Sequence, residues 1–315
     1  MKISGTGSAL PKKVVTNDML AQFLDTSDEW IKTRTGVSSR FVISDEKLED
    51  LAAEAAIKAL EDAGIKAEEL DFIICSNVVN EYITPQLSCI VQGAVGAHCP
   101  CIDINCACAG FIHAIEIAES FYQAGKVRNV LIVCAEEPTR MTDWADRTTC
   151  VLFGDGAGAA VLTPGDNIRS VKLSAASATD KLWQYRTLQM TPYITKEEKD
   201  VPLQMKGQEV FKFAVTAASK DITRALKESG MEPSQIDHYL LHQANIRIIN
   251  AIQHYLEQPA EKFPTNIGNH GNSSSACCPI LLDECNRAGR FKKGDMIAIS
   301  AFGAGFVSGA VIIEW

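Results

Sequence analysis

The chain of 315 residues contains no long apolar run. Its first residues, MKISGTGSALPKK, lack the apolar core of a signal peptide, and no stretch approaches the roughly 20 apolar residues that a membrane-spanning helix needs. Low-complexity tracts are absent. Basic residues, 30 in all, are outnumbered by 39 acidic ones, and the formal charge of −9 argues against nucleic acid as a partner. The sequence therefore predicts a cytoplasmic globular protein that binds neither membranes nor nucleic acid.

Cysteine is plentiful, but the pattern of a disulfide framework is missing. The count of 11 is odd, and several cysteines lie in apolar segments such as FIIC and LIVC, which is typical of buried reduced thiols. Residues 99–108 contain C-x-C-x4-C-x-C, whereas zinc pairs usually have C-x2-4-C spacing. GDGAGAA at residues 154–160 lacks the spacing of a Walker loop or a dinucleotide fingerprint. We therefore expect no metal and no nucleotide cofactor.

Apolar strand-like segments alternate with helical ones along the chain, which predicts an α/β fold. Residues 164–208 look irregular and are expected to connect two halves with surface excursions. The expected strands are DFIICSN (71–77), CIDINCA (101–107), NVLIVCAEE (129–137), GAAVLT (158–163), HYLLHQ (238–243), DMIAISAFG (295–303) and AVIIEW (310–315).

An internal repeat sharpens this picture. Residues 56–77 can be laid without gaps on residues 222–243, and each stretch contains a helix, a glycine stop, an acidic turn and a buried strand. Both the apolar positions and the order of elements agree. The chain is therefore expected to be a duplicated α/β unit, with one half at residues 1–165 and the other at residues 166–315.

The repeat brings three polar residues of different parts of the chain together. The alignment of residues 56–77 with residues 222–243 places His242 opposite Ser76. A second correspondence links Cys108 with Asn272, because each lies 17 residues before the glycine of an Ala-Gly pair that ends a helix. Related halves pack about a pseudo-two-fold axis, so loops at the same ends of corresponding elements converge. We therefore expect Cys108, His242 and Asn272 at one shared cleft.

The chemistry of these residues suits acyl transfer. Cys108 lies where the strand CIDINCA meets an amphipathic helix, and a helix N-terminus favours the thiolate that attacks thioesters. Cys106 is expected to belong to the strand and to pack structurally. His242 ends a strand, and Asn272 lies in a turn where it would cap a helix and also donate a hydrogen bond. The small residues of the loop 302–306 let backbone N–H groups approach a ligand as an oxyanion hole.

Six motifs carry a family resemblance: DTSDEWIKTRTG (25–36), CACAGF (106–111), DRTTCVLFGDGAGAAVL (146–162), LHQANIRII (241–249), HGNSSSA (270–276) and AFGAGF (301–306). Together and in this order they resemble the thiolase-like condensing enzymes, and among them the β-ketoacyl-acyl-carrier-protein synthase III group. The resemblance covers nearly the whole chain. It implies the thiolase-like fold, a duplicated five-layered α-β-α-β-α sandwich, and a homodimer.

The resemblance also implies a reaction. Cys108 would take an acyl group from an acyl-CoA primer, and His242 and Asn272 would hold the thioester carbonyl of malonyl-acyl carrier protein while it loses CO2. Claisen condensation would then yield a 3-oxoacyl-acyl carrier protein, the initiating step of fatty acid or polyketide-type synthesis. The N–H groups of Cys108 and Ala304 would form the oxyanion hole. No cofactor is implied besides these two substrates.

Further positions match substrate contacts of the group. Trp30 and Arg147 match the pair that sandwiches the CoA adenine, and Arg34 matches a basic residue that faces the CoA phosphates. Phe302 matches the phenylalanine beside the active site. Thr84 stands where a bulky phenylalanine from the dimer partner often limits the acyl pocket, which predicts a different or roomier pocket.

Lys212, Gln243 and Arg247 match positions near the tunnel mouth that receive the acidic carrier protein. Two more basic residues often follow in bacterial members, but this chain has His254 and Tyr255 there, which weakens the expected docking.

Three other functions stay open. One is a related acyltransferase or ketone-forming enzyme of secondary metabolism that uses the same acyl-Cys108 intermediate. A second is 3-hydroxy-3-methylglutaryl-CoA synthase chemistry, which needs a glutamate base, and Glu81 is the candidate in NVVNEYITP. A third is a non-catalytic partner of the same fold, in which the cysteine or the histidine would be expected to be lost. The sequence leaves the acyl primer, its chain length and the extender undetermined.

Overall fold

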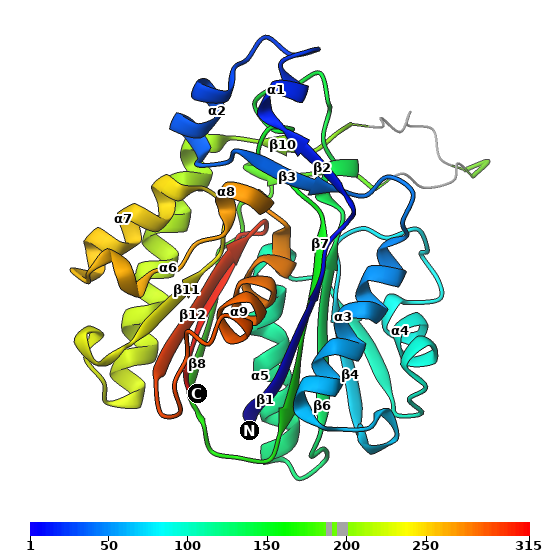
Figure 1. Cartoon of the computed structure of the whole chain (residues 1–315), viewed down its shortest axis with the longest axis vertical. Coiled ribbons are helices and arrows are strands. Elements are labelled where there is room, and N and C mark those ends of the chain that lie inside the picture. The colour runs from blue at the N-terminus through cyan, green and yellow to red at the C-terminus, as the bar shows by residue number, and fades with distance from the viewer. Residues whose placement is uncertain (187–190, 194–200) are drawn as a thin grey trace.

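The computed structural model describes residues 1–186, 191–193 and 201–315, and two β-sheets form its framework (Figure 1). The first sheet has the strand order β1-β7-β6-β4-β5, formed by β1 (Lys2–Ala9), β7 (Gly156–Thr163), β6 (Val130–Glu136), β4 (Phe72–Ser76) and β5 (Cys101–Ile104). The second has the order β11-β12-β13-β8, formed by β11 (His238–Leu241), β12 (Met296–Gly303), β13 (Val307–Glu314) and β8 (Ile168–Ala175).

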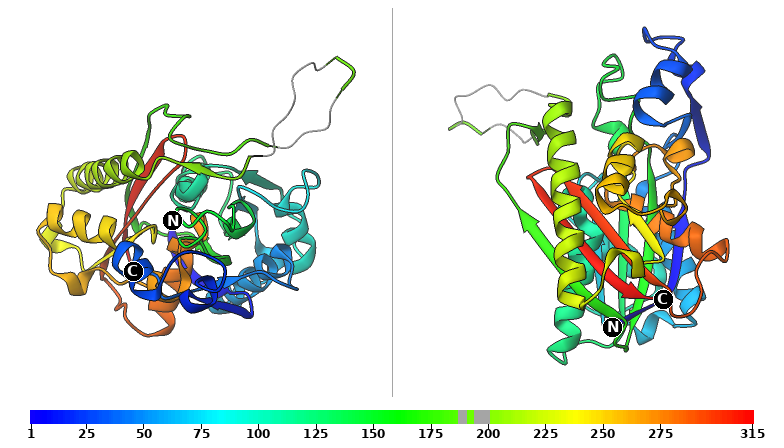
Figure 2. Two further views of the ribbon diagram at one scale, coloured as in Figure 1. Left: turned by 90° about the horizontal axis from the view of Figure 1, so that it is seen from above. Right: turned by 90° about the vertical axis from the view of Figure 1, so that its left-hand side faces the viewer.

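Helices lie outside both sheets and between them. The outer helices are α3 (Leu48–Ala63) and α4 (Leu87–Val95) on the first sheet, and α6 (Gly207–Ser229) and α7 (Ile246–Leu256) on the second. The central layer contains α5 (Gly110–Gln123) and α9 (Cys277–Arg287), whose apolar residues share one core with both sheets. Figure 1 and Figure 2 show these layers, and the predicted five-layered α-β-α-β-α arrangement is confirmed.

Shorter elements complete the chain. They are β2 (Lys13–Thr16), α1 (Asn17–Leu20), α2 (Asp28–Thr35), β3 (Ser39–Val42), η1 (Ala67–Glu69), η2 (Ala107–Ala109), η3 (Pro138–Arg140), β9 (Leu182–Trp183), β10 (Gln204–Met205), η4 (Pro233–Gln235), η5 (Ala260–Lys262), α8 (Ile267–His270) and η6 (Ser274–Ala276), where η marks a 3-10 helix. Within the described ranges, no helix is both long and apolar enough to cross a membrane.

Strand β1 and helix α3 approach each other closely because their facing residues are small. A Cβ added to Gly5 would lie 2.3 Å from the Ala63 backbone nitrogen, and one added to Gly7 would lie 2.3 Å from the Ala55 carbonyl oxygen. Ala55 and Ala59 are fully buried at this contact. The two glycines therefore set the distance between the outer helix and the sheet.

The two sheets repeat each other strand by strand. Strands β1, β7, β6 and β4 occupy the same order in the first sheet as β8, β13, β12 and β11 in the second. Gly64 and Gly230 end the outer helices α3 and α6 in the same left-handed conformation, with φ of 64° and 69°. The predicted duplication is thereby confirmed. The first sheet uses residues within 2–163 and the second uses residues within 168–314, and a division into halves at residue 165 remains our proposal.

One predicted correspondence between the halves is wrong. Helices α5 and α9 both follow a 3-10 turn whose first residue is left-handed, Ala107 with φ 45° and Ser274 with φ 52°. Counted from these turns, Cys108 corresponds to Ser275. The count from the helix ends fails because α5 has 14 residues and α9 has 11. Asn272 therefore lies before the turn, and reaches the site from a different backbone position than expected.

Two further expectations are corrected. The segment 164–208 is not irregular throughout, because β8 forms an edge of the second sheet; residues 187–190 and 194–200 lie outside the described residues. Cys106 does not belong to a strand, since β5 ends at Ile104 and Cys106 precedes the turn η2.

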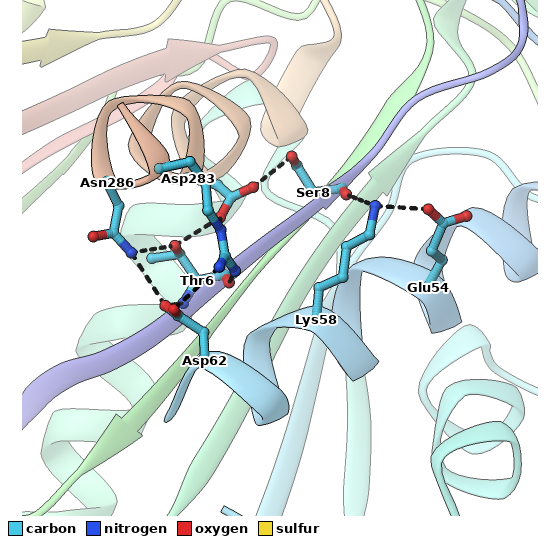
Figure 3. A network of polar contacts seen from close by, with 8 residues as sticks. Thr6, Ser8, Glu54, Lys58, Asp62, Asp283 and Asn286 are labelled. Carbon is cyan, nitrogen blue, oxygen red and sulfur yellow. Dashed lines mark hydrogen bonds and ion pairs between the residues drawn. The ribbon is translucent and has the colours of Figure 1, made fainter. Parts of the chain in front are cut away.

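A polar network joins α9 to the first half (Figure 3). Asp283 accepts hydrogen bonds from the hydroxyls of Thr6, at 2.7 Å, and Ser8, at 2.6 Å. Asn286 donates to Thr6 Oγ1 at 3.0 Å and to Asp62 Oδ2 at 3.1 Å. These bonds connect α9, β1 and α3. They hold the C-terminal half of α9 in a fixed place relative to the first half.

Candidate active site

A cavity of ≈ 190 Å³ brings the predicted triad together. Cys108, His242 and Asn272 all line it, and so do Phe302 and Ala304. Its remaining walls are mostly apolar and include Leu152, Phe153, Leu182, Leu203, Met205, Val210, Phe211, Phe213, Ile248 and Phe306. A cavity with apolar walls and a few convergent polar groups is suited to a small organic substrate.

Cys108 lies in the turn η2, directly before α5, as predicted. Its Sγ is 3.4 Å from Ser274 Oγ. The predicted preference for the thiolate is wrong: desolvation by the surrounding protein atoms raises the pKa of the Cys108 thiol to about 12, and the nearby Cys277 and Glu136 raise it further. The hydrogen bond with Ser274 opposes this shift only in part. Desolvation therefore favours the thiol over the thiolate, and a Cys108 that attacked an acyl group would have to give up its proton.

Asn272 is oriented by hydrogen bonds to its side-chain oxygen. Its Oδ1 accepts from the Ser274 N–H at 2.9 Å and lies 3.6 Å from the Cys277 thiol. The Asn272 N–H donates to the Leu152 carbonyl at 2.8 Å, which fixes the backbone. Because Oδ1 is engaged, the amide NH2 is the group that Asn272 offers to a ligand.

His242 follows β11 and is 2% exposed. Its backbone N–H donates to the Ser300 carbonyl at 2.8 Å, and its ring meets Phe302 edge-on at 5.1 Å. Burial lowers the pKa of His242 to about 3. The imidazole is therefore neutral at physiological pH, and a neutral ring can donate a hydrogen bond without carrying charge.

The predicted oxyanion hole lies where β12 ends against the turn of Cys108. Ala304 follows Gly303 and lines the cavity together with Cys108. A Cβ added to Gly303 would lie 2.6 Å from the Cys108 backbone nitrogen and 2.8 Å from Ala107 Cβ. The absence of a side chain at position 303 therefore lets the two loops meet.

We expect Gly303→Ala to move one of these loops. Overpacking of this kind costs about 1 to 3 kcal/mol of stability, and displacement of the Cys108 N–H should slow acyl transfer by about tenfold or more. Thermal unfolding and the rate of Cys108 acylation measure the two effects. Gly268→Ala is the matched control, because a Cβ there would meet its nearest neighbour, the Gly36 carbonyl oxygen, at an ordinary 3.6 Å. Equal rates in both variants would contradict the prediction.

Trp30, Arg34 and Arg147 gather at one place outside the cavity. The guanidinium carbons of Arg34 and Arg147 lie 4.4 and 5.1 Å from the Trp30 ring centroid. Arg147 also forms an ion pair with Asp25 at 3.1 Å. An inserted base needs roughly 7 Å between the flanking groups, so Arg147 must move before an adenine can lie between it and Trp30. Asn245, which lines the cavity, donates to the Arg34 carbonyl at 3.0 Å and places this cluster near the cavity.

Thr84 and Glu81 are exposed and are absent from the cavity lining of the described residues. Thr84 is predicted to act on a dimer partner, so its place in a single chain leaves that role a prediction.

The three residues predicted to dock the carrier protein do not all lie on the surface. Lys212 and Arg247 are exposed, and the Arg247 guanidinium lies 5.9 Å from the ring of Phe211, which lines the cavity. Gln243 is fully buried. Its Nε2 donates to the Leu241 carbonyl at 2.7 Å, and its Oε1 accepts from backbone N–H groups at residues 266 and 267. The surface role predicted for Gln243 is therefore wrong, because its side chain holds two loops together inside the protein.

Two polar residues that lie near Cys108 were not predicted from the sequence. Ser274 contacts the Cys108 thiol, and Glu136 lies behind Ser274 with 1% of its surface exposed. Burial raises the pKa of Glu136 to about 7. The signal in the sequence was a pair of carboxylates directly after the apolar run VLIVCA.

Comparison with known proteins gives two matching family descriptions. 3-Oxoacyl-[acyl-carrier-protein (ACP)] synthase III matches residues 102–180, and 3-Oxoacyl-[acyl-carrier-protein (ACP)] synthase III C terminal matches residues 226–315. The chain is 40% identical over 319 residues to the beta-ketoacyl-[acyl-carrier-protein] synthase III of Xanthomonas campestris pv. campestris, across 100% of this chain and 98% of the relative. The corresponding enzyme of Clostridium acetobutylicum is 40% identical over 322 residues, with the same coverage.

Solved structures agree. The 3-oxoacyl-[acyl-carrier-protein] synthase III of Aquifex aeolicus VF5 superposes with a TM-score of 0.93 at 39% identity, covering 100% of this chain and 99% of that one. The priming beta-ketosynthase of the R1128 polyketide biosynthetic pathway also has a TM-score of 0.93, at 32% identity, with coverages of 99% and 95%.

A duplicated five-layered fold with cysteine, histidine and asparagine around one cavity defines a thiolase-like condensing enzyme, and so an acyltransferase. Within that class, identity of 40% along the whole chain is decisive. The protein belongs to the β-ketoacyl-acyl-carrier-protein synthase III family. The resemblance seen in the six sequence motifs is confirmed.

Proposed function

We propose that the protein condenses an acyl-CoA primer with malonyl-acyl carrier protein, with loss of CO2, to give a 3-oxoacyl-acyl carrier protein. The observation that carries this proposal is the cavity itself, in which the Cys108 thiol lies together with two neutral hydrogen-bond donors, His242 and Asn272. A positively charged pair would suit a bound carboxylate, whereas neutral donors suit a thioester carbonyl on its way to an enolate.

The first half-reaction transfers the acyl group. The Cys108 sulfur forms a bond to the thioester carbonyl carbon of acyl-CoA, and the bond from that carbon to the CoA sulfur breaks. The backbone N–H groups of Cys108 and Ala304 stabilise the oxyanion between these events, and the apolar walls hold the acyl chain.

The second half-reaction forms the new carbon–carbon bond. Malonyl-acyl carrier protein enters, and the His242 ring N–H and the Asn272 NH2 donate to its thioester carbonyl. Loss of CO2 leaves an enolate that these donors stabilise. Its carbon attacks the acyl-Cys108 thioester, and Cys108 leaves as the thiolate.

Mass spectrometry tests the proposal. The protein is incubated with a panel of acyl-CoAs, and the peptide that contains Cys108 is examined for an acyl adduct before and after malonyl-acyl carrier protein is added. We expect an adduct with at least one primer, and its conversion into a 3-oxoacyl-carrier product. Absence of any adduct would refute the mechanism. Acylation without a malonyl-dependent product would favour the related acyltransferase.

We expect Trp30→Ala to weaken the binding of CoA without impairing the chemistry. Stacking of one base on an aromatic ring is worth roughly 1 to 3 kcal/mol, so KM for acyl-CoA should rise about tenfold while kcat changes little. Steady-state kinetics measure this split. A pantetheine thioester of the same acyl group lacks the adenine and serves as the control. If KM rose equally for both substrates, Trp30 would not contact the base.

We further propose a homodimer and a carrier-protein surface. Strand β5 is an edge of the first sheet, and Ile83, beside Thr84, is 71% exposed, as expected of a face that a second copy covers. Lys212 and Arg247 would receive the acidic carrier beside the cavity. Sedimentation velocity tests the dimer. The cytoplasmic location stays a prediction.

A further inference from the structure

A buried carboxylate lies behind the nucleophile, one hydroxyl away from it. Glu136 ends β6, and its Oε1 accepts hydrogen bonds from Ser274 Oγ at 3.2 Å and from Ser275 Oγ at 2.6 Å. Its Oε2 accepts from the Val78 N–H at 3.1 Å. Ser274 Oγ is also 3.4 Å from Cys108 Sγ. The three side chains form a continuous line from the sulfur to the carboxylate.

The direction of these hydrogen bonds follows from the number of protons. Ser274 has one O–H, and the ionised Glu136 carboxylate can only accept, so Ser274 donates to Glu136. The lone pairs of Ser274 Oγ then remain for the Cys108 S–H. Each bond along the line points toward Glu136, which is the arrangement that moves a proton away from the sulfur.

We propose that Glu136, acting through Ser274, is the proton acceptor for the Cys108 thiol during acyl transfer. This inference rests on the proposed function. As the sulfur bonds to the acyl carbon, its proton passes to Ser274 Oγ, and the proton of Ser274 passes to Glu136. The CoA thiolate leaves and takes a proton from water.

The second half-reaction returns the proton. When the enolate displaces Cys108, the thiolate takes a proton from Ser274, which is resupplied by Glu136. Over both steps, acyl-CoA, the malonyl carboxylate and one proton from water give the 3-oxoacyl product, CoA and CO2. Glu136 thus ends each cycle ionised, as it began.

The surroundings of Glu136 explain why a relay is needed. The titratable groups that face it are thiols: Cys134 on its own strand, Cys108 before α5, and Cys277 at the start of α9. Among the described residues, no lysine, arginine or histidine pairs with Glu136. A thiolate formed beside an ionised Glu136 would place two negative charges in one buried site. Transfer of the proton between them keeps a single charge.

The pH dependence has a definite sign. Burial raises the pKa of Glu136 to about 7, against the hydrogen bonds from Ser275, Val78 and Ser274. Glu136 is therefore largely protonated below pH 7 and accepts a proton only above it. The reactivity of Cys108 should rise with pH through an inflection near 7, far below the pKa of about 12 of the thiol.

Alkylation of Cys108 by iodoacetamide tests this without any acyl-CoA. Rates are measured from pH 5.5 to 9 in a Cys106→Ala background, and the modified residue is located by fragment-ion mass spectrometry. We expect Glu136→Gln and Ser274→Ala each to lower the rate at pH 8 by about 10²-fold and to remove the inflection. Glu136→Asp should restore part of both. With an acyl-CoA that forms an adduct on wild-type Cys108, the rate of acylation should fall by a similar factor in Glu136→Gln and Ser274→Ala.

Glu137→Gln is the matched control. Glu137 is also a buried glutamate, but it pairs with Arg140 at 3.1 Å and contacts neither Ser274 nor Cys108 among the described residues. Its variant should keep the wild-type profile. If Glu136 acted only as a charge, Glu136→Gln would lower the pKa of the thiol and speed alkylation, which would overturn the proposal. An unchanged profile in Ser274→Ala would overturn it as well, even if Glu136→Gln failed to fold.

The two proposals can fail separately. If no acyl-CoA loaded Cys108, the condensation would be refuted, while the alkylation profile would still report on the relay. If acylation and condensation proceeded normally in Glu136→Gln, the function would stand and the relay would be refuted.

Discussion

Replacement of Cys108 with alanine is expected to abolish acyl transfer. In the proposed mechanism the acyl group forms a covalent bond to a sulfur, and Cys108 is the single cysteine among the described residues that line the cavity. Loss of a catalytic nucleophile typically lowers the rate by a factor on the order of 10⁴ or more. Mass spectrometry should show no acyl adduct on the peptide that contained Cys108, and no 3-oxoacyl product should form.

The same variant should still decarboxylate malonyl-acyl carrier protein slowly, because His242 and Asn272 remain in place. Cys106→Ala is the matched control: Cys106 is two residues away and half-buried, but it does not line the described part of the cavity. That variant should retain its acylation rate. An acyl adduct in Cys108→Ala, or loss of acylation in Cys106→Ala, would show that the nucleophile has been misassigned.

Replacement of His242 with alanine should separate the two half-reactions. In the proposed mechanism acyl transfer uses the thiol and backbone N–H groups, so its rate should stay within a few-fold of wild type. Decarboxylation loses one of its two donors, and removal of such a donor usually costs about 10² to 10³ in rate. Release of labelled CO2 from malonyl-carrier, measured with pre-acylated protein, reports the second step alone. His254→Ala is the control, because His254 is exposed on α7 and away from the cavity lining.

The pH profile adds a second test of His242. Burial lowers its pKa to about 3, so the ring stays neutral from pH 5 to 9. Decarboxylation should therefore show no inflection near pH 6.5, the ordinary range of histidine. An inflection there, lost in His242→Ala, would mean that the imidazole carries charge during the reaction. Equal loss of both half-reactions would contradict the proposed division of roles.

The sequence predicted the fold where local pattern and burial agree. Strands β4, β6, β11, β12 and β13 are buried apolar runs, and each was expected close to its observed position. Strand β1 was missed because Gly5 and Gly7 have low strand propensity. These glycines instead let β1 pack closely against α3, and only the tertiary structure shows this contact.

The site was predictable as a set of residues, but not as a set of charge states. The motifs named Cys108, His242 and Asn272 in advance, although the repeat count that led to Asn272 used the wrong register. The thiol pKa was misjudged because a helix terminus can be seen in a sequence, whereas desolvation depends on packing around the folded cavity. The burial of Gln243 and Glu136 was not predicted, for the same reason. Polar residues are usually exposed, and nothing in the local pattern shows that these two are buried.

The structural match of Cys108 with Ser275 shows what two halves of different sequence make possible in one chain. In a dimer of two identical half-chains, both helix starts would have had to carry the same residue. In one polypeptide the two positions are independent, and here the first turn carries the thiol of Cys108 while the second carries the hydroxyls of Ser274 and Ser275. The asymmetry of the site therefore requires both halves, because the thiol comes from one and the hydroxyl beside it comes from the other.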